Sequence, residues 1–184
     1  MNNKTAFIYP GQGAQTPGMG VSLVDSFPQA AAVFDCASEI AGYDMLDLCA
    51  NGPAEKLSRT CYTQPALYTV EAAITDILRT RGVRPDMVAG HSLGEFAAWY
   101  AAEVYSFEDG LRIVLERGRL MDEVDPDGKG TMMAVIGMDR ADIEKVIADI
   151  DGTVVIANIN APGQMILSGE RDRKSTRLNS SHYS

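Results

Sequence analysis

The chain has few histidines and cysteines and no long apolar run. Two histidines and three cysteines occur among its 184 residues. No run of 18 apolar residues is present, so the sequence predicts no membrane-spanning helix. Cys36, Cys49 and Cys61 are odd in number and lack the spacing of a metal or redox site. Because no signal peptide precedes them, we expect a cytoplasmic protein with reduced thiols. We also expect neither a metal nor a cofactor.

Positive charge is also scarce. The formal net charge is −9 at pH 7, which argues against nucleic acid or an anionic membrane as a partner. The charge does not exclude an acidic substrate, since such a substrate needs only a local basic pocket. At this length the chain can bury one good core, with room for a small additional subdomain.

The most informative stretch is Gly90-His91-Ser92-Leu93-Gly94, which fits the Gly-x-Ser-x-Gly pattern of a nucleophile elbow. Such a serine sits on a strained turn between a strand and a helix, and the glycines let the two backbones approach. The context agrees, because residues 83–89 read as a buried strand and residues 95–102 as a helix. We therefore predict that Ser92 is a nucleophile. The alternative is a serine that only caps the following helix.

A nucleophilic serine needs a base, which is usually a histidine. His91 is adjacent to Ser92, so its side chain should leave the turn in another direction. His182 lies in a polar C-terminal segment that looks non-native. The sequence therefore predicts half of a catalytic pair and an inactive chain as it stands.

Further elements are expected around this motif. Residues 5–9 predict a strand that runs into a loop with two glycines. Helices are expected over 22–41, 64–81 and 107–124, the second with Thr63 as N-cap, Pro65 in its first turn and Gly82 at its end. The polar stretch 125–130 is the best candidate for a boundary.

Beyond this boundary the pattern changes. We expect a strand over 131–137, a helix over 140–150 and strands over 153–157 and 164–168, which make up most of a ferredoxin-like β-α-β-β-α-β unit. Residues 172–184 are polar and patternless, and they look like the translation of a sequencing adapter. The alternative is a native disordered basic tail. The expected division is a large domain over 1–127, a partial small subdomain over 128–171 and a non-native tail over 172–184.

Several motifs occur together in a fixed order. They are Tyr9-Pro10-Gly11-Gln12-Gly13-Ala14-Gln15 with Gly18-Met19-Gly20, Thr63-Gln64-Pro65-Ala66, Gly90-His91-Ser92-Leu93-Gly94-Glu95, Arg117-Gly118 with Met121, and Asn158-Ile159-Asn160-Ala161-Pro162-Gly163-Gln164. Through these motifs residues 4–170 resemble the malonyl-CoA:acyl carrier protein transacylases. The resemblance implies an α/β fold, with an α/β-hydrolase-like large domain and an inserted ferredoxin-like small subdomain. Both are incomplete here, because the last third of the family sequence, with its catalytic histidine, is absent.

The resemblance also implies a reaction. A malonyl group would pass from malonyl-CoA to the phosphopantetheine thiol of acyl carrier protein, through an ester on Ser92, in fatty acid biosynthesis. The backbone N–H groups of Gln12 and Leu93 would form the oxyanion hole that holds the developing negative charge. Arg117 would bind the free carboxylate of the malonyl group through two parallel hydrogen bonds.

Four further residues receive a role from the resemblance. His91 and Met121 would line the acyl pocket. Asn158 and Asn160, at a strand-to-loop transition, would hydrogen-bond the substrate from across the cleft. The alternatives are a satisfied core histidine and two ordinary turn residues. For Arg117 the alternative is a surface arginine paired with Glu116 or Asp122.

Two rival functions are compatible with the sequence. A serine esterase or thioesterase of the α/β-hydrolase class shares the elbow, but it explains neither the Gln12–Gln15 loop nor Arg117. The second rival is a non-catalytic fragment that keeps only the fold and the binding of the carrier.

Overall fold

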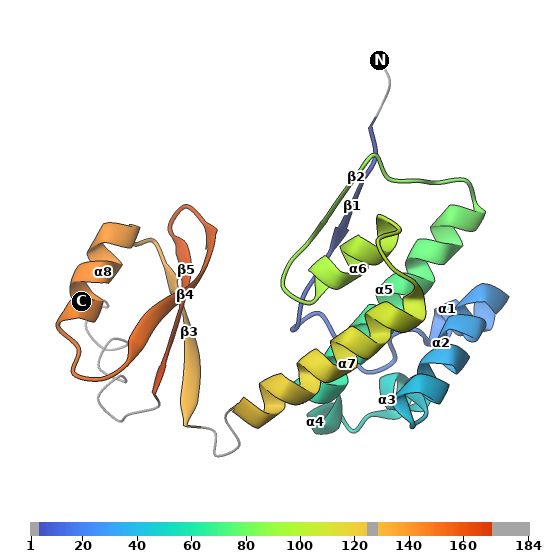
Figure 1. Cartoon of the computed structure of the whole chain (residues 1–184), viewed down its shortest axis with the longest axis horizontal. Coiled ribbons are helices and arrows are strands. Elements are labelled where there is room, and N and C mark those ends of the chain that lie inside the picture. Colours follow the sequence, from blue (N-terminus) through green and yellow to red (C-terminus); the bar gives the residue numbers. More distant parts are fainter. Residues whose placement is uncertain (1–3, 125–128, 171–184) are drawn as a thin grey trace. The chain divides into compact units, whose positions relative to one another are not determined.

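The computed structural model describes residues 4–124 and 129–170, which fall into two compact units (Figure 1). The first unit comprises residues 1–124 and the second residues 125–184. Each unit has a hydrophobic core of its own. The expected boundary between residues 127 and 128 and the tail 172–184 lie outside the described residues.

The first unit contains a two-stranded parallel sheet among helices. Its elements are β1 (Ala6–Tyr9), α1 (Val21–Ser26), α2 (Pro28–Ala41), α3 (Met45–Asn51), α4 (Ala54–Leu57), α5 (Thr60–Thr80), β2 (Met87–Gly90), α6 (Gly94–Ala101) and α7 (Phe107–Val124). The register of the sheet runs from Ala6 opposite Met87 to Tyr9 opposite Gly90. Helix α6 contacts both strands, so the segment that follows β2 folds back over the sheet.

Helices α5 and α7 pack closely because of a glycine. A Cβ built on Gly118 of α7 would lie 3.1 Å from the Cα of Cys61 in α5. A side chain there would separate the two helices. Gln64 lies one turn after Cys61 in α5 and Arg117 directly precedes Gly118 in α7, so this close approach brings the two side chains together.

The second unit is a three-stranded antiparallel sheet with one helix. Its elements are β3 (Gly130–Ile136), α8 (Arg140–Ala148), β4 (Val154–Ala161) and β5 (Gln164–Glu170), and the strand order is β3-β5-β4. Ile143 of α8 is buried against Met165 and Leu167 of β5, so the helix covers one face of the sheet. The expected succession of strand, helix, strand and strand is confirmed.

Two expected helices differ from the structure. The segment 22–41 forms two helices, α1 and α2, because the residue before a proline is disfavoured in the helical region. Phe27, which precedes Pro28, accordingly has φ −137° and ψ 110°. The N-cap at Thr63 is wrong: α5 begins at Thr60, and the Thr63 hydroxyl donates to the carbonyls of Leu57 and Arg59 from inside the helix.

Two strand bounds also shift. Strand β2 begins at Met87 rather than Val83. Strand β4 continues to Ala161, which places Asn158 and Asn160 within the strand rather than at a transition to a loop. In the part of the chain that the structure describes, no helix is both long and apolar enough to cross a membrane.

Candidate active site

Ser92 lies on a strained turn between β2 and α6. Its φ is +54°, a conformation that is costly for a residue with a side chain. The turn also requires glycine on both sides of Ser92 for steric reasons. A Cβ on Gly90 would overlap the carbonyl of Gly94, and a Cβ on Gly94 would overlap the carbonyl of Tyr9. The chain can turn this sharply only with glycine at both positions, and the turn leaves Ser92 exposed.

Ser92, Arg117 and Gln64 form one hydrogen-bonded group. The Nη2 of Arg117 donates to the Oγ of Ser92 at 3.1 Å, and its Nη1 donates to the Oε1 of Gln64 at 2.5 Å. Gln64 is 1% exposed, and its Nε2 donates to the Sδ of Met121 at 3.1 Å. A buried amide with partners at both ends has one orientation. Gln64 therefore fixes the guanidinium that faces the serine.

The surroundings of Arg117 leave its charge available. Partial burial lowers the pKa of its guanidinium, and the Glu95 carboxylate acts in the opposite direction. The group stays a cation, since arginine does not deprotonate in proteins. Its guanidinium also lies 5.4 Å from the centroid of the Phe96 ring.

Arg117 does not form either of the surface ion pairs considered above. Glu116 pairs with Arg119 at 2.6 Å, and Asp122 pairs with Arg59 at 2.7 Å. Among residues 4–124 and 129–170, no carboxylate forms an ion pair with Arg117. The guanidinium is thus held in place by a neutral amide and can still bind an anion.

Leu93 directly follows Ser92 in the elbow, and Gln12 lies in the loop after β1. The Nε2 of Gln12 donates to the Oγ1 of Thr60 at 3.2 Å, which ties the loop after β1 to the start of α5. Leu93 is buried directly before α6. Within the described parts of the chain, neither backbone N–H donates a hydrogen bond to another residue. Both groups are therefore available as donors.

The remaining candidates divide between the two units. His91 is exposed, and its Nδ1 would lie 3.1 Å from a Cβ built on Gly11 in the loop after β1. Met121 is 47% exposed and contacts Gln64 through its sulfur. Asn158 is half-buried and Asn160 is exposed, and both lie on β4 of the second unit.

Gln64 is a site residue that the sequence did not predict. The residue lies in the Thr63-Gln64-Pro65-Ala66 motif, but a glutamine in a helix is ordinarily exposed. A signal was nevertheless present: Gln64 is followed by an apolar stretch, Pro65-Ala66-Leu67, in a helix whose middle is buried. A polar side chain in such a segment must find a partner, and here the partner is Arg117.

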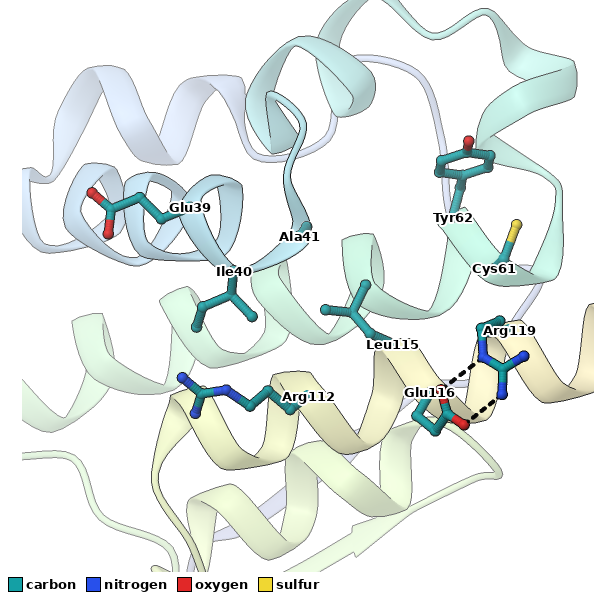
Figure 2. Close-up of a pocket in the computed structure, with 9 residues that line it drawn as sticks. All are labelled: Glu39, Ile40, Ala41, Cys61, Tyr62, Arg112, Leu115, Glu116 and Arg119. Atoms are coloured by element: carbon teal, nitrogen blue, oxygen red, sulfur yellow. Dashed lines mark hydrogen bonds and ion pairs between the residues drawn. The ribbon is translucent and has the colours of Figure 1, made fainter.

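A separate hollow of about 750 Å³ lies between α2, α5 and α7 (Figure 2). Its two arginines are not available, because Arg112 pairs with Asp109 and Arg119 pairs with Glu116. Burial raises the pKa of the Cys61 thiol, which makes it a poor nucleophile. None of the predicted site residues lines this hollow, and we assign it no chemistry.

Comparison with known proteins identifies the family. A model of the acyl transferase domain matches residues 6–180. The chain belongs to the acyl transferase domain family. The chain is 43% identical over 170 residues to the malonyl CoA-acyl carrier protein transacylase of Escherichia coli K12. The alignment covers 91% of the chain and 55% of that relative. The chain thus spans about half the length of the curated relative.

Solved structures agree with this assignment. The malonyl CoA-acyl carrier protein transacylase of Coxiella burnetii superposes with a TM-score of 0.89 at 38% identity, over 96% of this chain and 57% of that one. A second match is a type II polyketide synthase acyl-carrier protein in complex with its malonyl-transacylase. It has a TM-score of 0.86 at 38% identity, over 92% of this chain and 56% of that one.

Proposed function

We propose that the whole protein transfers a malonyl group from malonyl-CoA to the phosphopantetheine thiol of acyl carrier protein, through an ester on Ser92, in fatty acid biosynthesis. One observation carries the proposal: a guanidinium fixed by Gln64 lies 3.1 Å from the Oγ of Ser92. A cation held at that place suits an acyl group with a free carboxylate. The names of the curated relative and of the solved complex support the same substrate and carrier.

The reaction proceeds in two acyl transfers. The Oγ of Ser92 attacks the thioester carbonyl while the histidine implied by the resemblance takes its proton, and the N–H groups of Gln12 and Leu93 hold the resulting oxyanion. The C–S bond then breaks, and the histidine returns the proton so that coenzyme A leaves as its thiol. The phosphopantetheine thiol then attacks the ester and releases Ser92. During both steps Arg117 holds the malonyl carboxylate. An acetyl group would leave that charge unpaired, so Arg117 also gives selectivity.

The proposal extends to the finer description of the fold. We assign residues 1–127 to an α/β-hydrolase-like large domain, residues 128–171 to a partial ferredoxin-like subdomain and residues 172–184 to a non-native tail. The parallel β1–β2 pair with its serine turn supports the first assignment. The strand order β3-β5-β4, with a helix between the first two strands in sequence, supports the second.

Four further residues complete the proposed site. His91 and Met121 line the acyl pocket, and the contact between Met121 and Gln64 supports this for the methionine. Asn158 and Asn160 bind the substrate from the second unit. We also propose a cytoplasmic location, which is supported by three free cysteines, Cys36, Cys49 and Cys61.

We propose in addition that the 184-residue chain is inactive by itself. The hydrogen bond that Arg117 gives to Ser92 cannot activate the serine, because a guanidinium has no acceptor for its proton. The resemblance places the base, a histidine, in the last third of the family sequence. Loss of such a base typically lowers the rate by several orders of magnitude.

A chimera tests this function. Residues 1–170 are joined to the C-terminal part of the Escherichia coli relative and incubated with malonyl-CoA and acyl carrier protein. We expect malonyl carrier protein from the chimera, and none from its Ser92→Ala variant or from the 184-residue chain. Release of free malonate in preference to transfer would instead indicate an esterase. Equal turnover by the 184-residue chain would contradict the need for a distant base.

A further inference from the structure

Two polar side chains at the start of α5, Thr60 and Gln64, each contact a part of the serine site. They are four residues apart, so they lie on the same face of the helix. The Oε1 of Gln64 accepts a hydrogen bond from Arg117. The Oγ1 of Thr60 accepts one of 3.2 Å from the Nε2 of Gln12, in the loop after β1. One face of α5 therefore contacts both the guanidinium and the loop that carries a proposed oxyanion donor.

The loop around Gln12 depends on such contacts for its conformation. Gln12 lies between Gly11 and Gly13, and Gly13 has a φ of +111°. Because glycine leaves the backbone free to adopt many conformations, the local chain does not fix the direction of the Gln12 N–H. Gly11 is held by packing, since a Cβ there would lie 2.6 Å from the carbonyl oxygen of His91. The N–H of Gly13 donates to the Oε1 of Gln15 at 2.7 Å. The residue between the two glycines is held by its side-chain contact with α5.

The hydroxyl of Thr60 differs in its partner from other threonine hydroxyls of α5. Those of Thr69 and Thr75 donate to the carbonyls of Pro65 and Glu71, four residues earlier in the same helix. Such a bond back to the helix is ordinary for threonine. The N-cap residue of α5 makes no capping hydrogen bond through its side chain, and the hydroxyl of Thr60 contacts the loop after β1. Stability of the helix alone therefore does not account for this contact.

We propose that Thr60 is a positioning residue for the oxyanion hole: it holds the side chain of Gln12 and thereby directs the Gln12 backbone N–H towards the oxygen of the reacting thioester. This inference rests on the proposed function, because it concerns the same reaction at Ser92. Gln64 orients the cation for a carboxylate that only some acyl groups carry, whereas Thr60 acts on the carbonyl oxygen that every acyl group has. Replacement of Thr60 should therefore lower turnover without changing selectivity.

Turnover of the chimera tests this role. Thr60→Val keeps the shape of the side chain and removes the acceptor. We expect kcat to fall about 5-fold for malonyl-CoA and acetyl-CoA alike, with KM unchanged, as for one hydrogen bond that acts in the transition state. Thr60→Ser keeps the hydroxyl and should restore kcat. Thr80→Val is the matched control and should leave kcat unchanged, because Thr80, in the last turn of α5, accepts a hydrogen bond of the same length, 3.2 Å, from the Nε2 of Gln29.

A double-mutant cycle in the chimera shows whether Thr60 acts through Gln12. Gln12→Leu removes the side-chain donor and keeps the backbone N–H, so it should lower kcat as much as Thr60→Val does. The double variant should lose no more than either single variant. Losses that multiply would overturn the proposal. A loss for malonyl-CoA alone would also overturn it, because Thr60 would then act on the carboxylate and not on the thioester oxygen.

The order of the Gln12 N–H can be measured without turnover. In the 184-residue chain labelled with nitrogen-15, nuclear relaxation gives the order parameter of this group. We expect about 0.85 in the parent and in Thr80→Val, as for a rigid backbone, and below about 0.6 in Thr60→Val. Equal order in the parent and in Thr60→Val would overturn the positioning role. This measurement needs no activity, so an inactive chimera would contradict the proposed function and leave the role of Thr60 to be decided by the order parameter.

Discussion

The buried carboxyl of Glu71 makes a specific prediction about pH and stability. In the folded 184-residue chain the pKa of this group is raised to about 8 by burial, against an ordinary value of 4.5. Between these values the folded chain holds a proton that the unfolded chain has released. Stability must therefore fall as the pH rises from 4.5 towards 8, by ~1.4 kcal/mol for each pH unit. From about pH 5.5 to about pH 7.5 the loss is about 2.7 kcal/mol.

Urea unfolding of the chain and of its Glu71→Gln variant isolates this contribution. Glutamine has the same shape and does not titrate, so other ionisable groups cancel in the difference between the two curves. We expect the stability of Glu71→Gln relative to the parent to increase by about 2.7 kcal/mol over that pH range. Two curves that run parallel from pH 5.5 to pH 7.5 would show that Glu71 is ionised in the folded chain, and the reasoning from its burial would be wrong.

Three substitutions test the serine site. In the chimera, Arg117→Ala should lower kcat/KM for malonyl-CoA by a factor equivalent to about 3 kcal/mol of transition-state stabilisation. The loss for acetyl-CoA should be smaller, because only malonyl carries the carboxylate that pairs with Arg117. Equal losses for the two substrates would indicate a structural arginine. Gln64→Leu should lower kcat/KM for malonyl-CoA by roughly 10-fold, since Arg117 loses the acceptor that orients it, and it should leave acetyl transfer unchanged; a parallel loss for both substrates would refute this role. In the 184-residue chain, Gly94→Ala should lower the free energy of unfolding by about 1–3 kcal/mol, because its Cβ overlaps the Tyr9 carbonyl; an unchanged urea midpoint would contradict the required close approach.

Elements with strong local signals could be predicted from the sequence. Helix α7 has the expected bounds, 107–124, because its apolar residues recur on one face and it ends before a polar stretch. The turn at Ser92 was likewise predictable, since two glycines at fixed spacing allow one tight corner between a strand and a helix. The conformation of this turn is determined by the sterics of the local segment alone.

The start of α5 and the role of Gln64 depend on tertiary contacts. Thr63 and Pro65 together are typical of a helix start. In the structure α5 has already begun at Thr60, and the Thr63 hydroxyl donates a hydrogen bond to the carbonyl of Arg59. The partner of Gln64 comes from a residue 53 positions away in sequence. No local pattern indicates that Gly118 allows α7 to approach closely enough for this contact.

The most direct test of the account is the position of the acyl group. The chimera is incubated with malonyl-CoA in the absence of carrier protein, and the reaction is quenched with acid. The protein is then digested, and the masses of its peptides are measured by mass spectrometry. The account predicts one malonyl group on the peptide that contains Ser92, and none after Ser92→Ala. A malonyl group on the peptide of Cys61 or Cys36, with the Ser92 peptide unmodified, would contradict it.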